Sequence, residues 1–251
     1  MPGLTITIIT HEEERNIGKC LEAIQGLADE ILVVDSFSKD KTVDICNSYG
    51  CSVIQREFKG FADQKQFAVN EAKNDWILSV DADEVITKEL KNEIAGLLQR
   101  ENMPYQGYNI RISLCYLGRV LKHSGVGSDH KLRFFNRKHG KFESTEVHEL
   151  ITLKGSVGRL KGRLIHYSYH DLNHHMDKLN LYTTVAAAQN YNKGRKFSKL
   201  WCMFKFPITF LLYYFFKGGF RDGYPGFVWS FFASVYTTVK IAKTIELTGK
   251  S

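Results

Sequence analysis

The sequence lacks the features that define several large classes of protein. Its five cysteines are odd in number and show no CxxC spacing, so neither a disulfide framework nor a zinc ribbon is predicted, and we expect reduced, structural thiols. No basic segment followed by a long apolar run and a cleavage site opens the chain, so no secretory signal is predicted and we expect a cytosolic globular part. With 43% hydrophobic and 24% charged residues, the composition of the 251 residues is that of a folded globular protein.

A long uninterrupted apolar run is also missing. The longest one, Leu200 to Phe216, contains Lys205 and Pro207 and is slightly short for a helix that crosses about 30 Å of hydrocarbon. The segment is therefore expected to lie in a membrane interface rather than to cross the bilayer.

Positive charge is concentrated at the C-terminal end. Residues 193–251 contain ten Lys and Arg against Asp222 and Glu246, which leaves the rest of the chain near neutral. About half of all aromatic residues fall between Trp201 and Tyr236. Basic and aromatic residues together indicate an anionic surface. Apolar residues dominate between the charges, which favours a lipid surface over nucleic acid.

Four short apolar runs alternate with helical patterns in the first part of the chain. We expect strands at Leu4–Ile9, Glu30–Asp35, around Val53 and at Trp76–Val80. The helices expected between them are Glu13–Ile24, Lys39–Tyr49 with Ser38 as its cap, and a third with Phe61, Phe67 and Ala68 on its buried face. This alternation predicts an open α/β sheet that binds ligands beyond the carboxyl ends of its strands.

The pattern changes after this sheet. Short strands, including Tyr108–Leu114 and Lys131–Asn136, indicate an extension on the acceptor side of the site. A long helix is expected from about Asp171 to Tyr191, with Leu179, Tyr182, Val185 and Ala186 along one face. We therefore expect a domain over residues 1–170 and a helical, basic and aromatic region over residues 171–251.

The strongest local signal for chemistry is Asp81-Ala82-Asp83-Glu84, directly after an apolar strand. Two carboxylates at i and i+2 can bind a hard divalent cation, although an isolated DxD is more often a solvated acidic turn. Asp35 also ends a strand, where it could accept hydrogen bonds from a nucleobase or ribose or could cap a turn. Lys65 could neutralise phosphate or be an exposed helix lysine.

These pieces, in this order, resemble glycosyltransferase family 2 over about the first 170 residues. The resemblance rests on Ile8-Ile9-Thr10 with Glu13-Glu14 and Ile17, on Val33-Val34-Asp35-Ser36 with Asp40 and Thr42, and on Trp76-Ile77-Leu78 leading into the acidic motif. One position departs from the pattern, since Glu12 stands where the family usually has Asn.

The resemblance implies a Rossmann-like nucleotide-binding fold of the GT-A type. It implies that Thr10, Glu13 and Asp35 lie near the nucleoside and that Asp83 binds Mn²⁺ or Mg²⁺. We assign Asp81 to the same metal and nucleotide site, and we expect Lys65 and Arg133 to hold phosphate.

A second motif runs from Arg133-Phe134-Phe135-Asn136 through Gly140-Lys141-Phe142 to Val147-His148-Glu149. It resembles a subgroup of the family in which the Glu after His lies beside the acceptor. An inverting transfer needs a carboxylate that removes the acceptor's proton. Glu149 is the first candidate for this base and Glu146 the second, while His148 could contact metal or phosphate. Without the resemblance, this stretch would be read as a solvated hairpin.

Four histidines follow, of which His166, His170 and His174 have i, i+4 spacing, with His175 next to the last. A zinc site would need them on one helix, but the segment before Asp171 has the pattern of a strand, which disfavours zinc. The resemblance implies instead that His166 approaches the diphosphate or the metal.

With the tail segment Lys217 to Gly223 included, nearly the whole chain resembles lipopolysaccharide core glucosyltransferases. The resemblance implies inverting transfer of glucose or another hexose from a UDP-sugar to a lipid-linked saccharide. We expect a peripheral or monotopic enzyme at the cytoplasmic face of the inner membrane that does not bind nucleic acid. Two alternatives stay open: transfer to a polyprenyl phosphate, and a non-catalytic nucleotide-binding protein of the membrane surface.

Overall fold

The chain forms two compact units in a computed structural model that describes residues 2–127, 129–144 and 149–249, with only the backbone of Ser144 and Glu149. The first unit consists of residues 1–112 and 129–166, and the second of residues 113–128 and 167–251. The sequence placed the boundary at residue 170 and did not assign residues 113–128 to the second unit.

The first unit begins with four parallel strands in the order β3-β2-β1-β4. The chain moves outward from β1 to β3 and then crosses to β4 on the other side of β1, so the strand order reverses beside β1. Their bounds are β1 Leu4–Thr10, β2 Glu30–Asp35, β3 Ser52–Gln55 and β4 Trp76–Asp81. All four strands expected from the sequence are confirmed.

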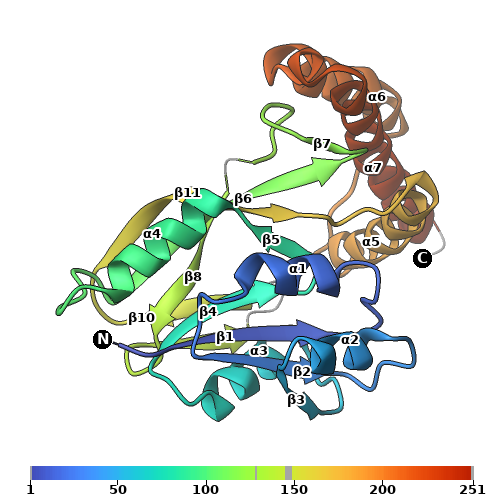
Figure 1. Cartoon of the computed structure of the whole chain (residues 1–251). Coiled ribbons are helices and arrows are strands. Elements are labelled where there is room, and N and C mark those ends of the chain that lie inside the picture. The colour runs from blue at the N-terminus through green and yellow to red at the C-terminus, as the bar shows by residue number, and fades with distance from the viewer. Residues whose placement is uncertain (1, 128, 145–148, 250–251) are drawn as a thin grey trace. The chain divides into compact units, whose positions relative to one another are not determined.

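Helices cover both faces of these strands (Figure 1). The bounds are α1 Ile17–Ile24, α2 Thr42–Ser48, α3 Phe61–Glu71 and α4 Lys88–Leu98. Alternate side chains of the strands point to opposite faces. One face packs on α1, α2 and α4, and the other packs on α3. In β4, for example, Leu78 belongs to the first core and Ile77 to the second, and both are fully buried.

Antiparallel strands extend the sheet beyond β4 in the order β8-β6-β11-β5. Their bounds are β5 Glu84–Ile86, β6 Gly107–Tyr116, β8 His130–Asn136 and β11 Val157–His166. The pairing of β5 with β11 sets His166 opposite Glu84. A separate hairpin of β9 Gly140–Ser144 and β10 Glu149–Leu153 contacts α3.

The second unit is mainly helical. It contains β7 Arg119–Val120, α5 Leu172–Asn192, α6 Lys199–Leu211, the π-helical turn η1 Leu212–Phe216, the 3-10 turn η2 Gly219–Asp222 and α7 Gly223–Gly249. Helix α7 contacts both α5 and α6. The core includes Tyr116, Leu121, Leu179, Val228 and Phe232. None of the helices in the described part of the chain is long and apolar enough to cross a membrane.

The Gly-rich tail segment has a structural role in this unit. A Cβ atom on Gly226 would lie 2.0 Å from the backbone oxygen of Gly219, so the chain can pack this closely only without a side chain. Asp222 accepts hydrogen bonds from the backbone N–H groups of Lys122 and His123, at 3.2 and 2.8 Å. The buried carboxylate therefore holds the loop after β7 against η2.

Three details of the expected helices are wrong. Ser38 does not cap a helix from Lys39, because its hydroxyl bonds Asp35, and α2 begins only at Thr42. The buried face of α3 excludes Phe61, which is 64% exposed, and includes Lys65, which the sequence alone would leave exposed. In α5, Leu179 is buried as expected, but Tyr182 and Val185 are exposed.

Candidate active site

The candidate site lies where the parallel strands end. Strand register places Thr10 opposite Asp35 in the β1–β2 ladder and Ile9 opposite Asp81 in the β1–β4 ladder. The polar residues that follow the strands therefore meet at the carboxyl edge of the sheet, beside the reversal of strand order where open α/β sheets bind their ligands.

Side-chain hydrogen bonds tie together the loops after β1 and β2. The backbone N–H of Glu12 donates to Ser38 Oγ at 2.8 Å, and that of Glu13 donates to Thr42 Oγ1 at 2.9 Å. The Thr42 hydroxyl in turn donates to Asp40 at 2.6 Å. Ser38, Asp40 and Thr42, which follow β2, thus hold the loop after β1 in place.

Thr10 and Asp35 differ in how their polar atoms are satisfied. Thr10 Oγ1 is buried and has no hydrogen-bond partner among the described residues, so it could contact a bound ligand. Asp35 is fully buried, and it accepts from Ser38 Oγ at 2.5 Å and from Gln55 Nε2 at 3.2 Å. Asp35 therefore organises the turn after β2, which is the turn-cap role that the sequence left open.

Glu13 lies beside these residues at the start of the loop that leads into α1. Its carboxylate accepts a hydrogen bond from Asn16 Nδ2 at 2.8 Å, and its backbone oxygen accepts from Asn16 N at 3.0 Å. Glu13 is thus fixed at the same edge of the sheet as Thr10 and Asp35.

A buried network of charges surrounds the first residue of the acidic motif. Asp81 pairs with Lys65 Nζ at 2.6 Å and with Arg133 Nη2 at 2.8 Å. The same Arg133 nitrogen lies 3.1 Å from Glu84, and the other Glu84 oxygen accepts the backbone N–H of Asp81 at 2.9 Å. Two carboxylates and two cations from α3, β4, β5 and β8 therefore balance one another.

Burial and charge act in opposite directions on these carboxylates. Burial alone would raise the pKa of Asp81, but attraction to Arg133 and Lys65 outweighs it and holds that pKa well below its usual value. Burial raises the pKa of Glu84, and the neighbouring Asp81 adds to the increase despite the attraction of Arg133. Asp81 is thus firmly ionised, and Glu84 is the easier of the two to protonate.

Asp83, the second aspartate of the motif, is in a different environment. Its Oδ2 lies 3.0 Å from Nε2 of His166, which the β5–β11 pairing brings to the acidic turn. Burial would lower the pKa of His166, but the hydrogen bond and the charge of Asp83 raise it overall. The Asp83 side chain is 18% exposed, so a small ligand can reach it.

Asp83 and His166 fit a divalent cation that a nucleotide brings with it. Carboxylate oxygen and imidazole nitrogen are both metal donors, and Mg²⁺ and its analogues use one or two protein ligands together with water and substrate phosphate. Within the described residues no group of three or more His, Cys, Asp or Glu could hold a metal ion.

Three candidates remain, Glu146, His148 and Glu149, which follow β9 in the sequence. Glu146 and His148 fall outside the described residues, and Glu149 is described only as the first backbone residue of β10, opposite Ser144. The hairpin is fixed to α3, because the backbone N–H of Phe142 donates to Gln66 Oε1 at 2.6 Å. It thus lies against the helix that carries Lys65.

Sequence reasoning missed two buried polar residues near the site. Glu84 was read only as the end of the acidic motif, although it is almost fully buried and fixes both Asp81 and Arg133. Gln64 is fully buried and joins Arg56 to Ser36, the residues that follow β3 and β2. In the sequence, neither residue differs from a surface Glu or Gln.

All five cysteines are free thiols, as expected. Cys20 is fully buried in α1, and its Sγ lies 3.8 Å from the backbone oxygen of Asp81. Burial raises its pKa well above the ordinary value, and the three carboxylates Glu84, Asp83 and Asp81 add to the increase. The thiol therefore stays neutral and acts as a packing residue under the acidic turn.

Four parallel strands, antiparallel strands beyond them and an acidic turn at the carboxyl edge make this a GT-A-like fold. A family model for glycosyl transferase family 2 matches residues 5–151. The chain belongs to this family.

Similar proteins agree with the family over the whole chain. An uncharacterized glycosyltransferase of Rickettsia typhi is 30% identical over 261 residues and covers 100% of this chain and 89% of its own length. The lipopolysaccharide core biosynthesis glycosyltransferase LpsC of Rhizobium meliloti is 32% identical over 252 residues, with 97% and 92% covered. Residues 1–349 of S. aureus TarS match with a TM-score of 0.50 at 14% identity over 99% of this chain and 91% of that one, a likeness of fold alone.

Proposed function

We propose that the protein is an inverting, metal-dependent glycosyltransferase that moves a hexose, such as glucose, from a UDP-sugar to a lipid-linked saccharide of the lipopolysaccharide core type. The observation that carries the proposal is that the two aspartates of the acidic motif have different ionic partners. Lys65 and Arg133 neutralise Asp81, whereas Asp83 is paired with His166 at the open edge of the sheet.

The donor would bind along the carboxyl edge. Thr10, Glu13 and Asp35 would border the nucleoside, and the unsatisfied Thr10 hydroxyl supports a contact there. Asp83 and His166 would hold Mn²⁺ or Mg²⁺, and His148 is a further candidate ligand. The cation supplies positive charge for the diphosphate as it leaves. Lys65 and Arg133 would fix Asp81 and add positive potential on the same side.

The chemical step would be a single displacement. The acceptor hydroxyl oxygen forms a bond to the anomeric carbon while the bond from that carbon to the UDP oxygen breaks, so the configuration inverts. Glu149 would take the hydroxyl proton, with Glu146 as the second candidate for this role. The β9–β10 hairpin supports this assignment, since it is fixed to the helix that carries Lys65.

The similarity to LpsC, whose name assigns it to lipopolysaccharide core biosynthesis, supports the proposed acceptor class. An acceptor of that class is anchored in a membrane, so we place the enzyme at the cytoplasmic face of the inner membrane as a peripheral or monotopic protein. The basic, aromatic C-terminal region is in keeping with that position.

The test is thermal unfolding with UDP, GDP or CMP, each with and without Mn²⁺. A site occupied at roughly 100 times its dissociation constant adds about 2.7 kcal/mol to the free energy of unfolding. We expect UDP to raise the unfolding temperature only when Mn²⁺ is present, and we expect this increase to disappear in Asp83→Asn. The matched control is Asp75→Asn, the same change at the exposed opposite end of β4. No shift with any nucleotide would contradict the donor site.

Two alternatives would give different results. A transferase for polyprenyl phosphate acts on an acceptor that is already an anion, so Glu149→Gln would leave its activity largely intact, whereas we expect the loss of transfer with UDP binding retained. A non-catalytic nucleotide-binding protein would show the UDP shift without turnover. Product analysis with membranes that contain either acceptor separates the first alternative from our proposal.

A further inference from the structure

Helix α6 and the turn η1 expose several large apolar side chains. Leu200, Phe204, Ile208, Leu211 and Phe215 follow one another at intervals of three or four residues and so share one side of the helix, and Phe216 follows at the end of η1. All six are exposed, and Phe216 reaches 83%. In the following paragraphs these six residues are called the α6 face.

The side of α6 that packs on α7 combines aromatic rings, including Phe206 against Phe231, with small polar contacts. Thr209 is the residue of α6 that is buried, and its hydroxyl lies 3.3 Å from that of Thr237. Nearby in α7 the fully buried Ser230 and Ser234 hydroxyls donate to backbone oxygens one turn earlier, both at 2.7 Å. Aromatic pairs such as Phe210 with Phe227 flank this polar line.

The exposure of the α6 face is the reverse of what water favours. In water a helix buries its large apolar side chains and exposes small and polar ones, because burial of apolar surface stabilises the folded state. In lipid the surroundings are as apolar as the side chains, so helices pack through small and hydroxyl-bearing residues and turn their large side chains outward. The side chains exposed on the α6 face are therefore those expected at a surface that contacts lipid.

Charge determines which surface can cover the α6 face. Lys205, Lys217 and Lys240 place their ammonium groups over the rings of Trp201, Tyr213 and Tyr236, at 5.3, 4.2 and 5.3 Å. Such pairs suit the headgroup region, where rings and alkyl stems are buried and the charges stay in water.

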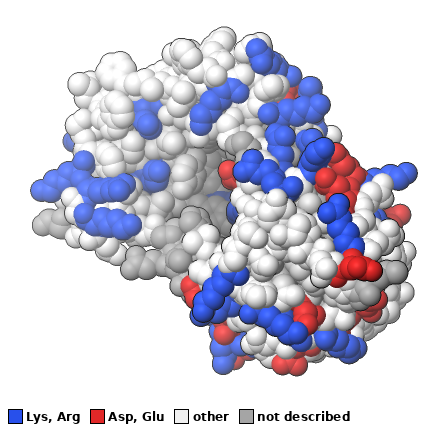
Figure 2. Space-filling view, turned by 90° about the vertical axis from the view of Figure 1, so that its left-hand side faces the viewer, with Lys and Arg blue, Asp and Glu red and all other residues white. Residues whose placement is uncertain are grey.

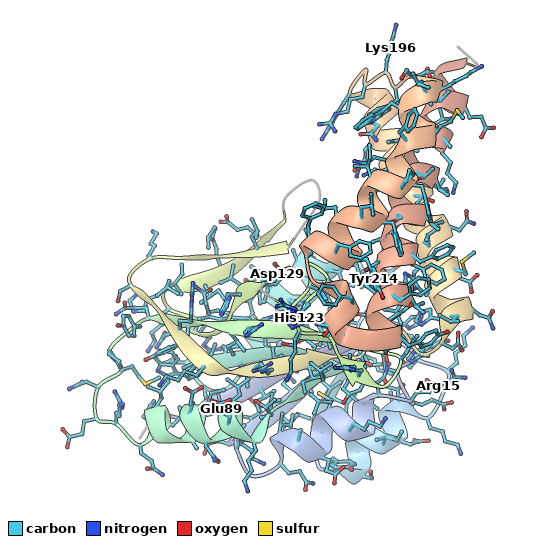
Figure 3. All side chains as sticks on the ribbon, turned by 90° about the horizontal axis from the view of Figure 1, so that it is seen from above. Arg15, Glu89, His123, Asp129, Lys196 and Tyr214 are labelled. Carbon is cyan, nitrogen blue, oxygen red and sulfur yellow. The ribbon has the colours of Figure 1, made fainter. Side chains whose placement is uncertain are left out.

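An anionic bilayer attracts this unit, whereas a second copy carries the same excess of positive charge and is repelled. Figure 2 shows Lys and Arg side chains scattered over broad uncharged areas on the face that it draws. In Figure 3, Lys196 points away from the end of the helices.

We propose that the α6 face lies in the interface of an anionic phospholipid bilayer, with the helix in the membrane plane and Lys205 and Lys217 at the lipid phosphates. Pro207 and Lys205 inside α6 favour this position over a crossing. The proposal rests on the proposed function for its biological purpose, which is to reach a lipid-anchored acceptor. It does not rest on that function for its test.

The test is sedimentation of the full chain with vesicles of phosphatidylcholine, with or without 30% phosphatidylglycerol. We expect binding to the anionic vesicles and a loss of at least tenfold in partition for the double variant Phe204→Gln and Phe216→Gln. Phe58→Gln with Phe61→Gln changes two comparably exposed phenylalanines of the first unit and is expected to leave binding unchanged. Lys205→Gln with Lys217→Gln should lose roughly fivefold per lysine, which corresponds to about 1 kcal/mol each.

A second measurement avoids dependence on the folding of a variant. Trp201 is 44% exposed whereas Trp76 is buried, so brominated phospholipid should quench the native fluorescence, and Trp201→Phe should remove most of this quenching. The proposal would be overturned if the native protein did not bind anionic vesicles, or if the fluorescence of Trp201 were not quenched. So would a dimer in solution that the Phe204→Gln, Phe216→Gln variant dissociates. The UDP and Mn²⁺ shift, measured on the same samples, reports separately on the donor site.

Discussion

Asp83 Oδ2 and His166 Nε2 lie 3.0 Å apart although 83 residues separate them in the chain. The turn between β4 and β5 supplies Asp83, and the end of β11 supplies His166. Antiparallel pairing of β5 with β11 therefore brings together the two side chains that we propose as metal ligands.

This relationship predicts a nitrogen ligand on bound Mn²⁺. With UDP present, pulsed electron paramagnetic resonance of the Mn²⁺ complex is expected to show imidazole ¹⁴N coupling, which His166→Gln should remove. Asp83→Asn should weaken Mn²⁺ binding at least tenfold, in line with the loss of a metal ligand. His170→Gln is the control, since His170 is exposed and lies outside the pair. Nitrogen coupling that survives His166→Gln would assign the ligand to another histidine.

Lys65 and Lys138 give a matched comparison of ion pairs. Lys65 lies 2.6 Å from Asp81 and is almost fully buried, whereas Lys138 lies 2.5 Å from Asp75 and is 67% exposed. Removal of one partner from a buried pair leaves an uncompensated charge, so Lys65→Met should reduce the free energy of unfolding by about 3 kcal/mol or more.

The exposed pair is screened by water, so Lys138→Met should cost less than about 1 kcal/mol. Urea unfolding of both variants measures the difference. Similar costs for the two variants would mean that Asp81 does not depend on Lys65 for its charge balance.

The departure at Glu12 from the family pattern has a structural consequence. Glu12 adopts φ of 55°, a left-handed conformation that Asn tolerates better than most residues. Glu12→Asn is therefore expected to raise the free energy of unfolding by roughly 0.5 to 1 kcal/mol. Glu57→Asn, on an exposed loop without positive φ, should change it little. Urea midpoints that move equally in both variants would exclude the backbone as the cause.

The sheet and its acidic edge could be predicted because both depend on local patterns. Apolar β-branched runs set the four parallel strands, and strand order then brings Thr10, Asp35 and Asp81 to one edge. The resemblance placed Arg133 and His166 at the site, but it did not predict their contacts with Asp81 and Asp83. Both residues reach the site through antiparallel strands whose register no local pattern determines.

Helix faces were mispredicted for a related reason. The expected apolar faces of α3 and α5 assumed that the large apolar side chains point inward. In α3 the buried Lys65 and Gln64 serve the polar network at the sheet edge, and Phe61 is left outside. In α5 the buried side includes His175 and Thr183. Polar cores of this kind do not follow the hydrophobic periodicity of a helix.

His175 in the second unit gives the last prediction, a dependence of stability on pH. The residue is buried and its Nδ1 lies 2.7 Å from the hydroxyl of Tyr116. Burial, with smaller contributions from His174 and Lys178, lowers the pKa of His175 from 6.5 to about 4. Burial raises the pKa of Tyr116 well above its ordinary value, so this phenol stays neutral and donates to Nδ1.

A lowered pKa means that the unfolded chain binds a proton more readily than the folded one. The stabilisation is fully present above the unfolded pKa near 6.5 and is lost as pH falls toward 4, by about 3 kcal/mol at most. Urea unfolding of the second unit between pH 4 and 7 should show this loss. In His175→Phe the free energy of unfolding should depend less on pH, while the ring packing on Trp229 and Phe232 is kept. His170→Phe, on the exposed side, should keep the native slope. An unchanged slope in His175→Phe would assign the pH dependence to carboxylates elsewhere in the chain.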